Sequence, residues 1–261
     1  MSARTLSHCS QKKSKRSGKM ADEAEKLTVQ VNEKEAVTAL LYPAAKKDRA
    51  GVTLLLGHGA GAGQASGFMR MYATGLAARG LDVMTFNFVY MEQGRSVPDQ
   101  KPKLEACFRA VIEAALKHKK LKNNSLVVGG KSMGGRIASQ VVAAEDESEV
   151  AGLVFLGYPL HPPGQSTKLR VEHLEHVKKP MLFVQGTRDA LGTPDEIEPH
   201  IKKLRPAPKI FAIEGGDHSF KAPKKFGLTP EQVHEAAMDE IDRWVRAISA
   251  DNAERTRIKR G

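Results

Sequence analysis

A serine in a glycine-rich turn is the residue of this chain best suited to covalent chemistry. Residues 130–134 read Gly-Lys-Ser-Met-Gly, which places a glycine two positions before Ser132 and another two positions after it. The apolar run 126–128 predicts a buried strand before the turn, and residues 134–144 predict a helix after it. A serine in such a sharp turn has a strained backbone, and only glycine fits where neighbouring chain passes closely. The pattern predicts an exposed nucleophilic hydroxyl. The competing interpretation is a glycine-rich turn in which the serine occurs by chance.

An acid and a base follow two later apolar runs. Asp189 comes after the run 180–184, and His218 comes after the run 209–213. Because the carboxyl ends of parallel strands meet at one edge of a sheet, we expect both side chains to lie near Ser132. The chain order nucleophile, acid, base is the order found in α/β-hydrolases.

The three side chains have complementary predicted roles. A neutral imidazole at His218 takes the proton of the Ser132 hydroxyl, because the hydroxyl alone is a poor nucleophile. Asp189 orients the ring and stabilises its protonated form. Asp217 is the competing acid, but side chains of adjacent residues diverge, so we expect it to shape the loop before His218. We expect Asp195 to interact with the dipole of the helix that it begins.

Backbone N–H groups are the predicted stabilisers of negative charge on the substrate. The N–H of Met133 follows the nucleophile directly, and the loop His58–Gly61 follows the run 52–56. We expect the N–H groups of Met133 and Ala60 to form an oxyanion hole. The loop could instead be a simple glycine turn or a weak phosphate loop, although it lacks the spacing of a P-loop.

Strands alternate with helices over most of the chain, which predicts an α/β fold with a mostly parallel sheet covered by helices on both faces. An amino-terminal hairpin precedes this alternation, and Thr193 and Thr229 each begin a capping box. We expect one domain over residues 27–249. The predicted strands are 27–31, 37–41, 52–56, 81–88, 126–128, 152–156, 180–184 and 209–213, and helices are expected to start near Phe68, Pro102, Gly134, Pro194 and Pro230.

Composition limits the class of protein. Apolar residues make up 41% of the 261 residues, which suffices for one sizeable core, and no run has the length of a membrane span. The two cysteines, Cys9 and Cys107, form no disulfide framework, so we expect a reducing, cytoplasmic setting. Cys107 has helical spacing with Leu104, Phe108 and Val111, which predicts a buried packing residue rather than a reactive thiol.

The net charge of +11 is concentrated near the chain ends. Residues 1–19 contain six basic residues and no acidic one, and residues 251–261 are also basic. We therefore expect no nucleic-acid binding by the folded part. Residues 1–26 are predicted to be a disordered basic tail, and residues 250–261 a basic C-terminal tail. A transit peptide, a nuclear import signal and an extension upstream of a start at Met20 remain alternatives for the first 19 residues, so nuclear or organellar locations stay open.

Several motifs together resemble the α/β-hydrolase family that includes testis-expressed protein 30 and subunit three of the nuclear NSL acetyltransferase complex. The chain is most similar to bacterial and plant members regarded as dienelactone-hydrolase-like. The resemblance implies an α/β-hydrolase fold, and the sequence matches the family pattern at Ser132, Asp189 and His218. It spans about residues 30 to 248 and rests on His58–Gly63, Phe86–Phe88, Gly129–Arg136, Gly157–Gly164, Leu169–Arg170, Phe183–Gly186 and Gly215–Phe220.

The short segment 160–180, where larger hydrolases insert a lid, predicts an open site for small soluble acyl compounds. His58 and His161 are the predicted substrate contacts. Lys131, Arg136, His161 and Arg170 could attract an acidic substrate, or they could be solvated or pair with Glu172 and Glu175. Tyr90 and Phe220 could line the site or simply pack.

We expect a serine hydrolase for an ester, thioester or lactone, with no cofactor and no metal, because no cluster of metal-binding residues has ligand spacing. The alternative is a non-catalytic scaffold with an α/β-hydrolase fold, in which case protein partners, including nuclear ones, become relevant.

Overall fold

The structure is a computed structural model that describes residues 24–45, 47, 49–144 and 149–260. It contains one eight-stranded sheet in the order β1-β2-β4-β3-β5-β6-β7-β8. The pairs β1–β2 and β2–β4 are antiparallel, and all later neighbours are parallel. The strands are β1 (Glu25–Asn32), β2 (Glu35–Tyr42), β3 (Val52–Gly57), β4 (Asp82–Phe86), β5 (Ser125–Lys131), β6 (Val150–Leu156), β7 (Met181–Gly186) and β8 (Lys209–Ile213).

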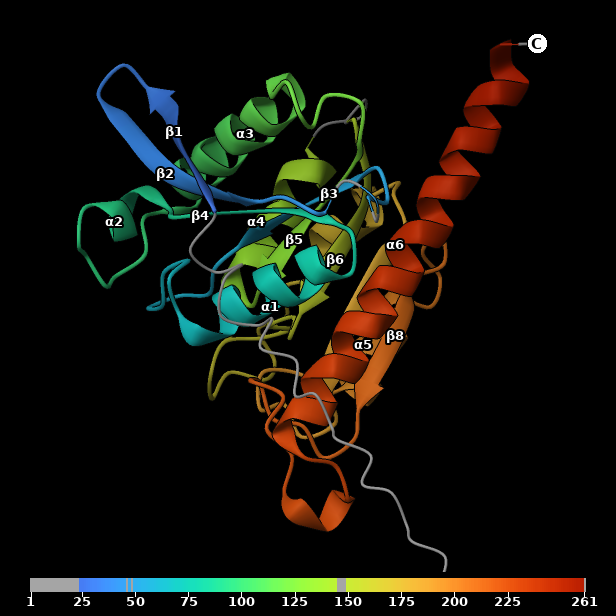
Figure 1. Ribbon diagram of the computed structural model, residues 1–261. Coiled ribbons are helices and arrows are strands. Elements are labelled where there is room, and N and C mark those ends of the chain that lie inside the picture. Colours follow the sequence, from blue (N-terminus) through green and yellow to red (C-terminus); the bar gives the residue numbers. More distant parts are fainter. Residues whose placement is uncertain (1–23, 46, 48, 145–148, 261) are drawn as a thin grey trace, which may run out of the picture.

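Helices cover both faces of the sheet, as the sequence predicts (Figure 1). Helices α3, α4 and α5 contribute to the apolar cluster on one face, and α1 and α6 contribute to the cluster on the other. The helices are α1 (Gly67–Ala78), α2 (Val89–Glu92), α3 (Lys101–Lys117), α4 (Met133–Ala143), α5 (Pro194–Ile201) and α6 (Pro230–Arg260), with 3-10 turns η2 (Glu172–His176) and η3 (Lys224–Phe226).

Burial on both faces explains the continuous apolar runs of the central strands. In β6, Leu153 and Phe155 belong to the α3–α4 side, whereas Val154 and Leu156 belong to the α1–α6 side. All four side chains are fully buried. Such a strand shows no alternation of apolar and polar residues, because neither of its faces meets water.

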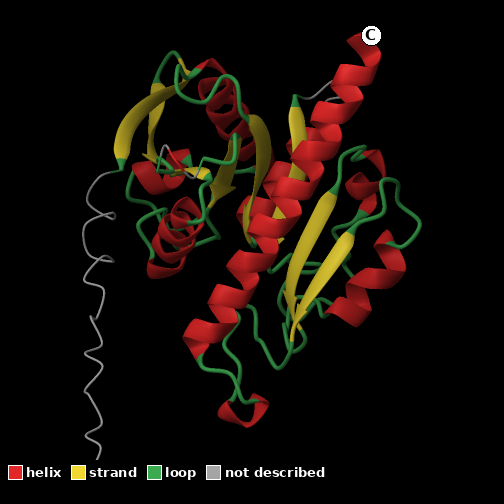
Figure 2. Cartoon of the chain, turned by 45° about the vertical axis from the view of Figure 1, so that its right-hand side comes forward, coloured by secondary structure: helices red, strands yellow, loops and turns green. Residues whose placement is uncertain are grey.

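The ends of the domain differ from their predicted bounds. Strand β1 begins at Glu25, inside the predicted tail, while residues 1–23 lie outside the described residues. Helix α6 continues to Arg260, so the backbone of residues 250–260, within the predicted basic tail, is helical (Figures 1 and 2). Both capping boxes are confirmed: Thr193 pairs with Glu196, and Thr229 pairs with Gln232.

The topology fixes where chemistry can occur. Strands β3, β5, β7 and β8 are parallel to one another, so the loops after them lie along the same edge of the sheet. These loops carry Ala60, Ser132, Asp189 and His218. Among the described residues, no helix has the length and apolar character needed to cross a bilayer.

Candidate active site

Ser132 occupies a strained turn between β5 and α4. Its φ of 50° lies in the left-handed region, which is rare for a residue other than glycine. Glycine is required on both sides of it. A Cβ on Gly130 would lie 2.1 Å from the carbonyl oxygen of Gly57, and a Cβ on Gly134 would lie 2.2 Å from the same oxygen. The predicted steric reason for both glycines is therefore confirmed.

Asp189 and His218 are in direct contact. His218 Nδ1 lies 2.8 Å from Asp189 Oδ2, and the Asp189 side chain is fully buried. Gln185 Nε2 donates to the same oxygen over 2.8 Å, and the Leu191 N–H donates to Oδ1 over 2.8 Å. The carboxylate is thus held from both sides, which fixes the orientation of the imidazole.

Ser132 and His218 line one hollow of about 400 Å³, together with Ala60, Phe68 and Lys131. Within the described part of the chain, no hydrogen bond joins Ser132 Oγ to the His218 ring. Hydrogen bonds between catalytic groups are often long in ligand-free enzymes and shorten once substrate binds. Ser132 and the Asp189–His218 pair therefore lie in the same site. Substrate binding would have to bring Ser132 Oγ within hydrogen-bond distance of the His218 ring.

The two residues predicted to form the oxyanion hole lie beside Ser132. Ala60 and Met133 line a second hollow with Ser132, of about 370 Å³. Met133 is the first residue of α4, and the first N–H groups of a helix have no acceptor within it. Because helix amino termini also carry partial positive charge, this corner suits a developing oxyanion.

His58 lies in the core and not at the substrate position predicted for it. The side chain is fully buried, its Nε2 accepts from the Phe88 N–H over 3.1 Å, and its Nδ1 lies 2.8 Å from Gly59 O. Both ring nitrogens are therefore occupied by backbone, and burial lowers the pKa of the imidazole. His58 ties the loop after β3 to the end of β4, which positions Ala60 indirectly.

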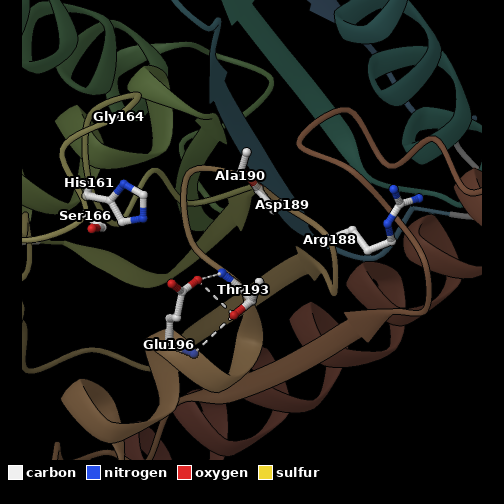
Figure 3. Close-up of a pocket in the computed structure, with 8 residues that line it drawn as sticks. All are labelled: His161, Gly164, Ser166, Arg188, Asp189, Ala190, Thr193 and Glu196. Atoms are coloured by element: carbon white, nitrogen blue, oxygen red, sulfur yellow. Dashed lines mark hydrogen bonds between the residues drawn. The ribbon is translucent and has the colours of Figure 1, made fainter.

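His161 faces a different hollow from Ser132. This hollow, of about 520 Å³, is lined by His161, Arg188, Asp189, Thr193 and Glu196 (Figure 3). Ser132 does not line it, so the position of His161 does not support the predicted contact with a substrate held at the serine. Among the described residues that line this hollow, Asp189 is the one that also belongs to the candidate site.

Lys131 is half-buried and lines the hollow that contains Ser132, but its ammonium binds the loop of His218. Its ammonium donates to the carbonyl oxygen of His218 and lies 5.5 Å from the ring centroid of Phe68 and 5.7 Å from that of Phe220. Burial lowers the pKa of Lys131 to about 8, although Asp189 and Asp217 act in the opposite direction. Lys131 thus anchors the loop that carries His218.

The remaining acidic and aromatic candidates have structural positions. Asp217 Oδ1 accepts from the N–H groups of Ser219 and Lys221, so it shapes the loop as predicted. Asp195 lies in the first turn of α5, where a helix dipole favours a carboxylate. Tyr90 and Phe220 are fully buried and pack in the core, and Cys107 is buried with its pKa raised to about 12.

Sequence reasoning did not identify the residues that complete the site. Gln185 orients Asp189, while Phe68 and Leu191 line the hollow that contains Ser132. A glutamine at the buried carboxyl end of a predicted central strand was a usable signal, because a buried amide needs partners. Within the described residues, no cluster of three or more His, Cys, Asp or Glu side chains could hold a metal ion.

Solved structures share this fold. The protein XC6422 from Xanthomonas campestris, described as an α/β serine hydrolase without lid, is 19% identical with a TM-score of 0.65, covering 85% of this chain and 95% of its own. A dienelactone hydrolase from Anabaena variabilis is 19% identical with a TM-score of 0.67, covering 85% of this chain and 96% of its own. Est1E from Butyrivibrio proteoclasticus is 14% identical with a TM-score of 0.63, covering 83% of this chain and 98% of its own.

The sequence itself also matches a family model. The model describes an alpha/beta hydrolase domain and matches residues 50–246, which include every strand from β3 to β8. The matched region contains Ser132, Asp189 and His218 and ends inside α6. The chain therefore belongs to the alpha/beta hydrolase domain family.

Proposed function

We propose that the protein is a serine hydrolase that acts on small esters, thioesters or lactones. The observation that carries this proposal is the buried Asp189 carboxylate on His218 Nδ1, with the ring in the same hollow as a strained Ser132. An aspartate on one imidazole nitrogen leaves the other free to take a proton from a hydroxyl.

The proposed reaction has two halves. Ser132 Oγ attacks the acyl carbon while His218 Nε2 accepts the hydroxyl proton, and the N–H groups of Ala60 and Met133 stabilise the oxyanion. The protonated imidazole then gives its proton to the leaving alcohol or thiol. A water molecule, deprotonated by His218, attacks the acyl-enzyme, which releases a carboxylic acid and restores the serine hydroxyl.

Site dimensions favour small substrates. The two hollows beside Ser132 measure about 400 and 370 Å³, which is at the lower end of the range for small-molecule sites. The segment between β6 and β7 contains one 3-10 turn, η2, and no helical cap. Both the serine esterase chemistry and the resemblance to testis-expressed protein 30 and NSL subunit three stay predictions.

Labelling by a fluorophosphonate probe tests the proposal. We expect wild-type protein to be labelled, and Ser132→Ala to lose labelling because no activated hydroxyl remains. Asp189→Asn should lower kcat/KM on a short activated ester by about 10³- to 10⁴-fold. Asp217→Asn is the matched control, since an amide oxygen still accepts the two loop N–H groups, and we expect a loss below about tenfold.

The opposite results would favour a non-catalytic scaffold. Well-folded wild-type protein that takes up no probe would argue against an activated serine. Equal losses from Asp189→Asn and Asp217→Asn would mean that the acid acts only through the shape of the loop.

A further inference from the structure

Lys131 joins the turn that carries the nucleophile to the loop that carries the base. It is the last residue of β5 and directly precedes Ser132. Its side chain extends to a distant part of the sequence, where the ammonium donates to the backbone carbonyl oxygen of His218. The reaction proposed above gives this lysine no role. A single residue nevertheless contacts the segments of both reacting side chains.

The loop that Lys131 holds is strained. Phe220, two residues after His218, has a φ of 66°, which is rare for a bulky side chain. Backbone hydrogen bonds close the loop, because the Phe220 N–H donates to Asp217 O over 2.9 Å and the Asp217 N–H donates to Lys221 O over 3.0 Å. Backbone strain of this kind persists only where the surroundings impose it. His218 therefore lies in a segment that should relax when its outer contacts are lost.

The ammonium of Lys131 supplies several of those outer contacts. Besides the carbonyl oxygen of His218, it lies 5.7 Å from the ring centroid of Phe220, which is within the range of cation–π attraction. It also lies 5.5 Å from the ring centroid of Phe68 at the start of α1. Gly157, after β6, leaves space for this arrangement, since a Cβ there would lie 2.9 Å from Lys131 Nζ and 3.1 Å from His218 O. Three segments around the nucleophile thus meet at one cation.

The other cations near the nucleophile are placed differently. Arg136 and Arg170 line the second hollow. Among the described residues, neither has a carboxylate within ion-pair distance, so the alternative that they pair with Glu172 or Glu175 is wrong. In the same part of the chain, Lys131 also has no carboxylate within that distance. Its charge is therefore stabilised by a backbone carbonyl and two rings and not by an ion pair.

Titratable groups surround the ammonium. Burial lowers the pKa of Lys131 to about 8, although Asp189 and Asp217 favour the protonated form. The imidazole of His218 is also close, since a Cβ on the glycine after β6 would contact both groups. On α6, His234 packs against the same two rings that the ammonium contacts, and burial lowers its pKa, so it is uncharged above pH 7. Lys131 therefore changes its charge just above neutral pH.

We propose that Lys131 is a positioning residue for His218 and acts through its positive charge. The inference rests on the proposed hydrolase function and specifies how pH regulates that site. The ammonium holds the strained loop so that the imidazole meets Ser132. An ionised donor makes a stronger hydrogen bond than a neutral amine, and a neutral amine has no cation–π attraction to the rings. Loss of the proton should therefore let the loop relax and slow the reaction.

The pH profile of kcat on 4-nitrophenyl butyrate tests the proposal. We expect wild-type kcat to fall above about pH 8 with the loss of one proton, by at most about tenfold per pH unit. Lys131→Met should lower kcat at pH 7 by about 10- to 100-fold, since a displacement of ~1 Å has an effect of that size, and should lack the fall. KM should change by less than about threefold, because the substrate is uncharged. Unfolding would not explain the fall, because loss of the proton removes the cost of burying the ammonium.

Lys117→Met is the matched control. Lys117 is exposed at the carboxyl end of α3, before β5 begins, and so lies at the edge of the sheet opposite to the site. It pairs with Glu113 over 3.0 Å. The variant loses the same charge and should keep the wild-type kcat and pH profile. Identical pH profiles for the wild type and Lys131→Met would overturn the proposal, and so would a change in KM alone.

Chemical rescue separates the charge of the side chain from its volume. Lys131 lines the hollow of Ser132, so a small cation can enter the space that Lys131→Ala leaves. Propylammonium has the length of the missing atoms. We expect it to raise the kcat of Lys131→Ala at pH 7 by about tenfold, and propanol, which has a similar size and no charge, to have no effect. Equal rescue by both compounds would mean that the side chain acts only by filling space.

Hydrogen exchange separates this inference from the hydrolase proposal. The N–H groups of Ser219 and Lys221 are bonded to Asp217 within the loop, and their exchange requires no catalysis. We expect both to exchange about tenfold faster in Lys131→Met than in the wild type at pH 7. Probe labelling of the wild type with unchanged exchange would leave the hydrolase intact and reject the positioning role. Faster exchange without any probe labelling would reject the hydrolase, and the positioning role with it.

Discussion

At the scale of single residues, the site combines one strained nucleophile with side chains buried around it. Ser132 keeps a left-handed backbone, and Asp189 and Lys131 both approach the loop that carries His218. Asp189 binds the imidazole ring, whereas Lys131 binds the backbone carbonyl of the same residue. The position of His218 therefore depends on a fully buried anion and a half-buried cation.

Burial of Lys131 predicts a dependence of stability on pH. The folded-state pKa of about 8 lies below the ordinary value of 10.5, so the unfolded chain binds more protons between these pH values. The unfavourable contribution of Lys131 is fully present below about pH 8 and disappears as the pH rises through 10.5. Relative to Lys131→Met, the wild type should gain stability over this window, by at most ~1.4 kcal/mol per pH unit.

Urea unfolding at a series of pH values measures this difference. Other groups that titrate in the same range cancel when the variant is subtracted from the wild type. A difference that stays constant from pH 8 to 10.5 would mean that the ammonium is as well solvated in the fold as in the unfolded chain.

Single residues also mark where sequence reasoning fails. Ser132, Asp189 and His218 could be selected because each follows an apolar run, and strand ends are visible in sequence. The position of His58 could not be predicted in this way, because its partner, the Phe88 N–H, belongs to a loop 30 residues later. The sequence presents Lys131 and Arg136 alike, as charges near the site, yet the ammonium of Lys131 binds the loop of His218 and Arg136 lines the second hollow. That distinction depends on side-chain direction within one turn.

At the scale of elements, the approach of α4 to β3 determines the shape of the nucleophile turn. Gly130 and Gly134 both pack on the carbonyl oxygen of Gly57, the last residue of β3. A methyl group on Gly134 would push α4 away from β3, and a methyl group on Gly130 would push β5 away from β3. The neighbouring loop carries Ala60, so the same displacement would also disturb the predicted oxyanion hole.

Gly134→Ala tests this packing. The new Cβ would meet backbone at 2.2 Å, which no side-chain rotation can relieve, so we expect a loss of stability of about 3 kcal/mol or more and no probe labelling. Gly67→Ala is the matched control. A Cβ there has no neighbour within 4 Å, and alanine is a better helix former at this first position of α1. Thermal unfolding that shows the same change for both variants would contradict the packing explanation.

Element positions were predicted well where burial leaves a clear pattern. The runs 52–56 and 152–156 became β3 and β6 because central strands are apolar throughout, and the run 209–213 became the edge strand β8. The sequence does not predict the extension of α6 to Arg260, because the regular spacing of large apolar residues that predicts the helix stops at Ile248.

At the scale of the whole molecule, two apolar clusters on opposite faces share the same strands. Val154 and Phe155 are adjacent in β6 and belong to different clusters. Phe155 packs against the rings of Phe183 and Tyr158, with centroid distances of 4.6 and 5.2 Å. Because the sheet joins the clusters, we expect the domain to unfold as one unit.

Phe155→Ala should therefore lower the free energy of unfolding by about 3–5 kcal/mol, and the remaining protein should still unfold in a single transition. Val97→Ala is the control, since Val97 is 72% exposed and should change stability by less than about 0.5 kcal/mol. Urea titrations followed by circular dichroism and by Trp244 fluorescence measure both values. Separate transitions for the two signals would mean that the α1–α6 side and the α3–α4 side are independent.

The shared contact of Gly130 and Gly134 with Gly57 O also bears on evolutionary inference. These glycines are required because β5 and α4 both approach the end of β3 closely, whether or not a serine lies between them. A descendant that had lost Ser132 and become an inert binding protein would still need both glycines to fold. The presence of both glycines in a related chain therefore indicates common ancestry and not enzymatic activity. The residue between the two glycines must be identified before such a chain is assigned as an enzyme.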